Sequence, residues 1–143
     1  MSTLLIPYKS LEGQERLPFI TLTLNGPKRS VRADAFADSG ADFSIFDASI
    51  MEYIGFKKRK AEVRRVQVGD GDWMKVFLFQ VRVNFYGYSF VAPITFASQL
   101  GVGLNLLGRR GFFNRFRFCF DDKNFRLSIH LSRAAREVPF RAG

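Results

Sequence analysis

Two early stretches of the chain alternate apolar and polar residues, which is the pattern of a half-buried β-strand. The first is PFITLTLNG, residues 18–26, and the Asn-Gly-Pro that follows its last leucine predicts a turn. The second is SVRADAFADSG, residues 30–40, which carries the alternation up to Asp38. We therefore expect two consecutive strands, the second of which delivers an aspartate to a glycine-containing turn.

The middle and the end of the chain carry the same kind of signal. Residues 61–85 form two apolar, β-branched runs joined by Gly-Asp-Gly-Asp, and these residue types tolerate the positive φ of tight hairpin turns. We expect a long β-hairpin there, followed by a further strand within residues 86–97. Residues 116–130 predict a closing hairpin whose turn lies at 121–124.

Helices are expected to be few and short. Asp47 stands just before ASIMEYI and can cap a helix that Gly55 would close. A second short helix is expected in RRGFFNRFRF, residues 109–118, despite its internal glycine. The whole pattern predicts one mostly β domain. We place it at residues 18–130, between a loose N-terminal arm at 1–17 and a tail at 131–143.

Length and composition fit a single folded domain. The chain has 143 residues, of which 47% are hydrophobic and 24% charged, so it can bury a sizeable core. Its 17 phenylalanines favour strands. The single cysteine, Cys119, excludes an intrachain disulfide, and no apolar run reaches the roughly 18 residues of a membrane span. No secretion signal is recognisable, so we expect a cytoplasmic protein.

The formal net charge of +9 raises the question of an anionic partner such as nucleic acid. The basic residues are scattered, and their dense run is KKRK, residues 57–60. Because no nucleic-acid-binding motif accompanies it, a solvated basic surface is the simpler interpretation, and nucleic acid is not an expected partner. A nucleic-acid-binding β protein is the weakest alternative. It would bind in a strongly salt-dependent way and independently of Asp38.

The sequence offers little for a metal or a cofactor, and we expect neither. One histidine, His130, and one cysteine cannot make the usual zinc site, and no serine nucleophile elbow accompanies the histidine. GVGLNLLG, residues 101–108, lacks the Lys-Ser or Lys-Thr that ends a phosphate-binding loop. It also lacks the third glycine of the dinucleotide fingerprint.

The tripeptide Asp38-Ser39-Gly40 has an ordinary explanation as a turn. Asp and Ser accept backbone hydrogen bonds, and Gly supplies backbone freedom. The residues around this tripeptide show features that a simple turn would not need. The flanking runs are apolar, a second acid follows at Asp42, and LNLLGRRGFF appears later in the chain at residues 104–113.

Together these features resemble the retropepsin-like aspartic proteases, the retroviral type. That family's signature is an apolar strand, Asp-Thr/Ser-Gly-Ala, and later two apolar residues followed by Gly-Arg and a short helix. Here the elements are ADSGAD at residues 37–42 and LLGR at residues 106–109, with the 61–85 hairpin between them. The resemblance spans about residues 18–130. It implies an all-β fold, a retropepsin-like closed β-barrel with a flap hairpin and one or two short helices.

The resemblance implies that Asp38 is the catalytic residue of an aspartic endopeptidase. The mechanism needs one ionised carboxylate to activate water and one protonated carboxyl to polarise the scissile carbonyl. Two carboxylates about 3 Å apart share one proton, since like charges so close cannot both ionise easily. The chain has one such motif, so each subunit of a homodimer would supply its Asp38. A peptide or protein substrate and a second copy are the expected partners.

The resemblance also assigns supporting roles around the catalytic loop. Ser39 would hydrogen-bond across the dimer axis, and Gly40 would bring the backbone close to the substrate. Ala41 and Asp42 would line the bound peptide.

The later motif would support this loop from behind. Leu106 and Leu107 would form an apolar floor, and Gly108 would allow a close approach. Arg109 would pair with Asp42 in a bidentate ion pair, and its alternative is a plain surface cation.

The hairpin tip would be the flap that closes over an extended peptide. Its acids at positions 70 and 72 favour basic substrate residues or simply make a soluble turn. Trp73 would pack over the substrate or on the flap base. The flap residues are Val68, Gly69, Asp70, Gly71, Asp72 and Trp73.

One part of the family pattern is not recognisable in this sequence. Retropepsins build a dimer sheet from their terminal strands, whereas this chain ends in the basic SRAAREVPFRAG. Dimerisation through another surface therefore stays open. So does a different function, a non-catalytic module that keeps the fold to bind a peptide or a partner.

Overall fold

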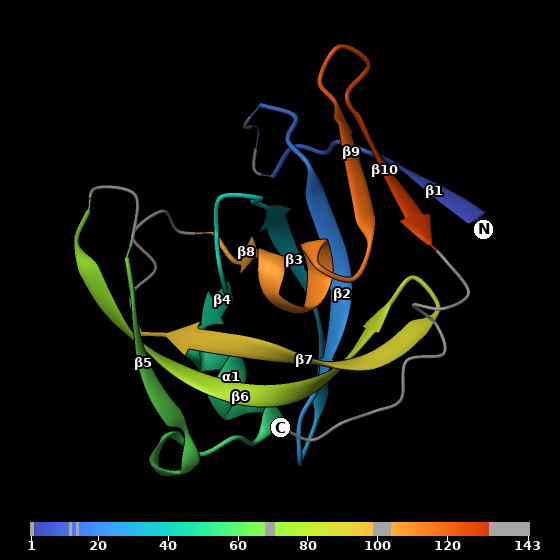
Figure 1. The fold of residues 1–143 in the computed structure, drawn as a ribbon. Helices are drawn as coiled ribbons and strands as arrows, with labels where there is room; N and C mark the ends of the chain where they lie inside the picture. The colour runs from blue at the N-terminus through green and yellow to red at the C-terminus, as the bar shows by residue number, and fades with distance from the viewer. Residues whose placement is uncertain (1, 12, 14, 68–70, 99–103, 132–143) are drawn as a thin grey trace.

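The computed structural model describes residues 2–11, 13, 15–67, 71–98 and 104–131, whose strands form two sheets (Figure 1). The larger sheet has the order β2-β3-β8-β4-β7-β6-β5, and the smaller one β1-β10-β9. The strands are β1 (Ser2–Pro7), β2 (Phe19–Asn25), β3 (Ser30–Ala37), β4 (Ser44–Asp47), β5 (Glu62–Gln67), β6 (Trp73–Phe85), β7 (Tyr88–Ala97), β8 (Leu106–Leu107), β9 (Arg117–Asp121) and β10 (Arg126–Leu131). The short helical segments are α1 (Ala48–Ile54), η1 (Lys58–Lys60) and η2 (Arg109–Phe113).

The larger sheet closes on itself through β2. One edge of β2 pairs with β3 along its whole length, and the strand also pairs with the far end of β6. The closing pairs are Thr23↔Asn84, Leu24↔Val83 and Asn25↔Arg82. The expected all-β, barrel-like fold is therefore confirmed, and β5 lies outside the ring as the partner of the first half of β6.

The predicted local elements are also confirmed. The two early strands, the long 61–85 hairpin and the closing hairpin appear as β2, β3, β5–β6 and β9–β10. In α1 the Asp47 carboxylate accepts from the Ser49 N–H at 2.8 Å, and Gly55 ends the helix at φ +101°. Among the described residues, no helix is long and apolar enough to cross a bilayer.

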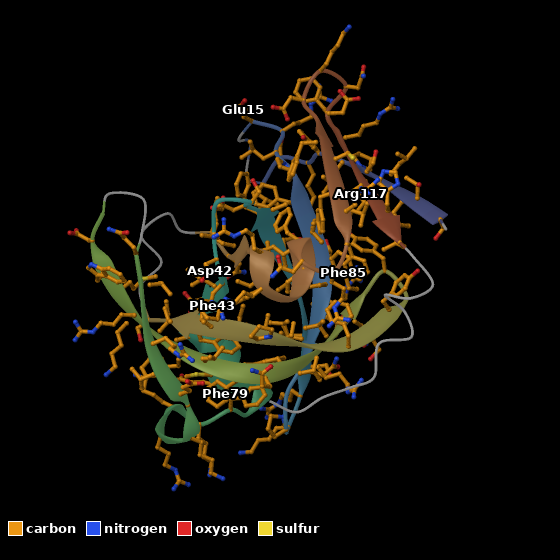
Figure 2. All side chains as sticks on the ribbon, in the orientation of Figure 1. Glu15, Asp42, Phe43, Phe79, Phe85 and Arg117 are labelled. Atoms are coloured by element: carbon orange, nitrogen blue, oxygen red, sulfur yellow. The ribbon has the colours of Figure 1, made fainter. Side chains whose placement is uncertain are left out.

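Phenylalanine fills the barrel interior, where alternate strand residues point inward. Phe85, labelled in Figure 2, is fully buried, and its ring stacks on Phe116 with 5.1 Å between centroids. Phe112 and Phe90 pack against the same ring at 5.7 and 6.3 Å. The short segment η2 is thereby fixed to the core by its aromatic residues.

The N-terminal segment differs from the loose arm that the sequence suggested. Residues 2–7 form β1, which pairs antiparallel with β10 from Ser2↔Leu131 to Pro7↔Arg126. Leu4 and Ile6 pack against the core, and this burial with the ladder orders the strand. The limits 18–130 stay a prediction for the domain, and most of the expected tail lies outside the described residues.

Candidate active site

Asp38 stands where β3 leaves the barrel. The N–H of the preceding Ala37 donates to the Pro18 carbonyl at 3.0 Å, and the Asp38 N–H donates to the Leu107 carbonyl at 3.0 Å. The turn then folds back on the aspartate. The Gly40 N–H donates to Asp38 Oδ1 at 2.9 Å, and the Ala41 N–H donates to the Asp38 carbonyl at 3.1 Å. Backbone bonds therefore fix both the position of Asp38 and the orientation of its carboxylate.

The two-residue strand β8 lies behind this turn. It runs parallel to β3 through Phe36↔Leu106 and Ala37↔Leu107, and antiparallel to β4 through Ile45↔Leu106. Leu107 is fully buried in the main core. Leu106 packs instead against a small apolar cluster that contains Ile45. The residues expected to form an apolar floor thus lie directly behind the turn at Asp38.

Gly108 permits a close backbone crossing at the end of β8. A Cβ at this position would lie 2.5 Å from the carbonyl carbon and oxygen of Phe43 and 2.9 Å from the Ala41 carbonyl oxygen. The Gly108 N–H donates to the buried Ser44 Oγ at 2.9 Å, and the next amide, of Arg109, donates to the Ala41 carbonyl at 2.9 Å. Segments 38–44 and 106–109, far apart in the sequence, are thereby joined backbone to backbone.

Asp42 faces two arginines, and the nearer one is not Arg109. The Nε of Arg110 lies 3.1 Å from Asp42 Oδ1 in a hydrogen bond, whereas the Nη2 of Arg109 lies 4.0 Å away. The Arg110 guanidinium also covers the Phe43 ring at 4.5 Å. Figure 2 labels Asp42 and Phe43 beside η2. The expected bidentate pair with Arg109 is replaced by a single bond from its neighbour, because Arg110 takes an extended conformation (ψ 120°).

Asn105 is a site residue that the sequence reasoning did not assign. Its side-chain oxygen accepts from the Asp47 N–H at 3.1 Å, and its amide nitrogen donates to the Asp34 carbonyl at 3.0 Å. Its own carbonyl accepts from the Phe36 N–H at 2.8 Å. One side chain thus ties β3 to the end of β4. The sequence feature that could have indicated this role is that a polar residue stands immediately before the Leu-Leu-Gly run.

A cleft of about 460 Å³ opens beside Asp38. One wall is the segment that precedes β2, another is the turn itself, and the third is the tip of the β9–β10 hairpin. The cleft also contains two further carboxylates, from Glu15 and Asp122. Its lining residues are Tyr8, Glu15, Arg16, Leu17, Pro18, Phe36, Ala37, Asp38, Ser39, Phe120, Asp122 and Phe125.

Many solved structures resemble the chain, among them two aspartic proteases. A retropepsin-like aspartic protease from Rickettsia conorii matches with a TM-score of 0.66 and 19% identity, over 91% of this chain and 99% of that chain. The EIAV protease complexed with the inhibitor HBY-793 matches with a TM-score of 0.54 and 18% identity, over 70% of this chain and 88% of that chain. The chain has the retropepsin-like fold. No protein-family model and no curated protein matches it.

The β5–β6 hairpin, which the sequence analysis expects to be a flap, lies at the left edge of the molecule in Figure 1. The half of the hairpin nearer its turn packs toward β8 through Val66, Met74 and Val76, which join the small cluster around Leu106. Trp73 is 65% exposed at the start of β6. Gly71 has φ +90°, as tight turns require. The predicted flap residues Val68, Gly69 and Asp70 lie outside the described residues.

Polar contacts fix the segment that walls the cleft. Lys9 Nζ lies 2.7 Å from Asp34 Oδ1, and the Thr21 hydroxyl donates to the same oxygen at 2.5 Å. Burial alone raises the pKa of Asp34. The hydrogen bonds from Lys9 and Thr21 and the nearby positive charges outweigh burial, so this pKa lies below its usual value. The segment before β2 is thus fastened to the β2–β3 hairpin.

A second contact fastens the opposite wall of the cleft. The Tyr8 hydroxyl donates to Asp122 Oδ1 at 2.7 Å, and burial together with this carboxylate raises the pKa of Tyr8. The Arg16 guanidinium lies 3.9 Å from the centroid of the Phe125 ring. In the part of the chain that the structure describes, no group of three or more His, Cys, Asp or Glu side chains is placed to hold a metal ion.

Proposed function

We propose that the chain is an aspartic endopeptidase that acts as a homodimer, with one Asp38 from each subunit forming the catalytic pair. The observation that carries the proposal is the fixed carboxylate of Asp38. It stands on a backbone-braced turn at the edge of a cleft, with the Gly40 amide on Oδ1. The retropepsin-like fold and the likeness to two aspartic proteases support the reaction class.

The chemistry follows from two carboxyl groups that share one proton. The ionised carboxylate takes a proton from a water molecule, whose oxygen attacks the scissile carbonyl carbon. The protonated carboxyl gives its proton to the carbonyl oxygen, and a tetrahedral intermediate forms. When the C–N bond breaks, the leaving nitrogen takes a proton from one carboxyl of the pair. A hydroxyl of the intermediate gives its proton to the other carboxylate as the carbonyl re-forms. The pair ends as it began, with one proton between two oxygens.

The arrangement of the turn supports a two-chain site. Ser39 and Gly40 are exposed next to the part-buried Asp38, so a second copy can approach the turn directly. The Ser39 hydroxyl would bond across the axis, and the β5–β6 hairpin would close over the extended peptide and exclude water. Asp42, held by Arg110, would bind the peptide backbone beside the cleaved bond.

The decisive experiment compares cleavage of a peptide library by the wild type and by Asp38→Asn across pH 3 to 8, with the oligomeric state measured by sedimentation. We expect cleavage only in samples that contain dimers, and none by the variant. The two other acids of the cleft supply matched controls, because Glu15→Gln and Asp122→Asn should keep cleaving.

A mixing experiment tests the shared site. Dimers with one wild-type and one Asp38→Asn subunit should be inactive if both carboxylates are needed. Cleavage that persists in Asp38→Asn, or that is carried by monomers, would overturn the proposal. A folded wild-type dimer that cleaves nothing at any pH would point instead to a non-catalytic peptide-binding module.

A further inference from the structure

Basic residues from separate parts of the sequence meet where α1, η1 and the β5–β6 hairpin adjoin. Along the sequence they are scattered, and only KKRK, residues 57–60, forms a dense run, which is why nucleic acid was not an expected partner. The fold brings the others next to that run. We call the resulting surface the basic stripe. Its members, all exposed, are Lys28, Arg29, the run 57–60, Arg65 and Lys75.

The stripe begins where the β2–β3 turn meets the end of α1. The Lys28 N–H donates to the Ile54 carbonyl at 2.9 Å. The Arg29 guanidinium donates to the Tyr53 carbonyl at 3.0 Å and lies 5.2 Å from the centroid of the Tyr53 ring. That ring is 52% exposed. Because the chain leaves α1 here and enters KKRK, the cations of the turn adjoin those of the run.

The KKRK run meets the β5–β6 hairpin over the ring of Phe77. Lys58 Nζ lies 4.8 Å from the centroid of this ring, and Lys75 Nζ lies 5.6 Å from it. Lys75 also stands directly opposite Arg65 in the β5–β6 ladder, where like charges destabilise a sheet. Across the part of the chain that the structure describes, no carboxylate forms an ion pair with any of these three cations. The fold thus concentrates positive charge that the chain does not compensate.

The two faces of the β5–β6 hairpin differ in charge. Val66 and Met74 oppose each other on the face that packs toward β8. Arg64 shares that face and is paired with Glu62, whose carboxylate accepts from Nε at 3.0 Å and from Nη2 at 2.7 Å. The uncompensated cations of β5 and β6 lie on the opposite face. In Figure 2 nitrogen-tipped side chains project from η1 and β5 at the lower left.

Exposed aromatic rings stand at both ends of the stripe. Tyr53 lies at one end beside Arg29. At the other end Trp73 precedes Lys75 by two residues on β6, so the two side chains share a face of the hairpin. Trp73 is 65% exposed. Proteins that bind single-stranded nucleic acid combine cations, which bind the phosphates, with exposed rings on which unpaired bases stack.

Two other anionic partners fit the stripe less well. A nucleic-acid duplex keeps its bases stacked on one another inside the helix, so the exposed rings would find no base to stack on. A membrane surface is bound by a continuous apolar face that enters the boundary between headgroups and acyl chains. Here Tyr53 and Trp73 stand at opposite ends with cations between them.

We propose that the basic stripe binds single-stranded nucleic acid, with its cations on the phosphates and with Trp73 and Tyr53 each stacked on an unpaired base. None of the residues of the stripe lines the cleft at Asp38, so the surface is separate from the candidate active site. The inference does not rest on the proposed peptidase.

Trp73 reports binding directly, because it is the single tryptophan of the chain. Titration with a single-stranded oligothymidylate at low salt should quench its fluorescence. The logarithm of the binding constant should fall linearly with the logarithm of the salt concentration. Asp38→Asn should bind as tightly as the wild type, which keeps this test independent of cleavage. Fluorescence that the oligonucleotide leaves unchanged would overturn the proposal.

Three variants, measured by the anisotropy of a labelled oligothymidylate, separate the stripe from net charge. Arg65→Glu should weaken binding about tenfold or more. It also gives Lys75 an unlike partner, so its urea midpoint should not fall below that of the wild type. Trp73→Ala should weaken binding about tenfold through lost stacking. Lys123→Glu makes the same charge change at the exposed β9–β10 turn and should stay within about twofold of the wild type. Equal losses from Arg65→Glu and Lys123→Glu would contradict a localised site.

Competition identifies the class of ligand. Oligothymidylate annealed to its complement should compete at least about tenfold less well than the free strand at equal phosphate concentration. Vesicles of phosphatidylcholine and phosphatidylserine in equal amounts should not displace the oligonucleotide. A duplex that competes equally, or vesicles that displace it, would refute the assignment. Comparing oligouridylate with oligothymidylate of the same length shows whether RNA or DNA binds more tightly, and tight binding of either supports the proposal.

Discussion

Arg110 and Asp42 are joined by two hydrogen bonds, a side-chain bond from Nε to Oδ1 at 3.1 Å and a backbone bond from the Arg110 N–H to the Asp42 carbonyl at 2.9 Å. The Arg110 guanidinium also lies over the Phe43 ring. Both side chains of the ion pair are 51% exposed, so its contribution to folding is small. Its effect is to hold Asp42 beside the turn at Asp38. The same carboxylate has only a distant contact, at 4.0 Å, with Arg109.

Replacing the two arginines should therefore give unequal results. Arg110→Ala loses the side-chain bond to Asp42 and the contact with Phe43, and we expect a loss of up to about 1 kcal/mol in stability. We also expect a raised KM for peptide substrates. Arg109→Ala should stay within about 0.5 kcal/mol of the wild type. Urea unfolding and steady-state kinetics of both variants measure this, and a larger effect from Arg109→Ala would contradict the structure.

Substitution by alanine should have different effects at Gly108 and at Gly40. In Gly108→Ala the new Cβ meets backbone atoms of Phe43 at 2.5 Å, which cannot rotate away, so we expect a loss of about 3 kcal/mol. In Gly40→Ala the nearest atom is Asp38 Oδ1 at 3.2 Å, which can shift slightly. That variant should fold within about 1 kcal/mol of the wild type yet lose activity. Unfolding midpoints and cleavage rates distinguish the two variants. A Gly108→Ala variant as stable as the wild type would show that the backbones at Gly108 and Phe43 are not packed as closely as described.

Asn105 should prove structural for the site. Asn105→Leu leaves the Asp47 N–H and the Asp34 carbonyl without their partners, and we expect a cost of about 2–3 kcal/mol. Asn105→Asp keeps an acceptor for the Asp47 N–H and loses only the donor to Asp34, so it should cost less. Chemical unfolding of both variants checks the order. Equal stability of the leucine variant and the wild type would mean that neither bond matters.

Stability at acid pH should depend on Asp34. The pKa of this carboxyl is lower in the folded chain than in the unfolded one, so its contribution is present above the unfolded value of about 3.9. That contribution is lost as the pH falls through the folded value. The urea midpoint of the wild type should therefore drop more between pH 5 and pH 3 than that of Asp34→Asn. Lys9→Met, which removes the nearest cation, should also show a smaller drop, and identical drops in all three proteins would refute the assignment.

Features that depend on neighbours in the sequence were predicted well. The alternation of residues 18–26 and 30–37 gave β2 and β3, because a period of two is itself the condition for burying one face of a strand. Asp47 and Gly55 marked the ends of α1, because caps act within one turn of the backbone. The turn at Asp38 belongs to this class too.

Features that depend on distant segments were decided by the tertiary structure. Residues 2–7 carry a weak pattern and become β1 only because β10 offers an edge. Leu106 and Leu107 form a strand of only two residues. This strand exists because it pairs with β3 on one side and β4 on the other, and local sequence cannot show that pairing. Arg110 rather than Arg109 reaches Asp42, because the chain bends between Arg110 and Gly111, whose φ is +87° and which lies against Ala92.

The sequence by itself determined β2, β3, the two later hairpins, the turn at Asp38 and the order of the two motifs, since each depends on residues that are close together in the chain. Only the fold determined which arginine supports Asp42 and which residues wall the cleft. Those are properties of segments brought together across the barrel, and burial and backbone pairing between them fix the geometry more strongly than any local preference.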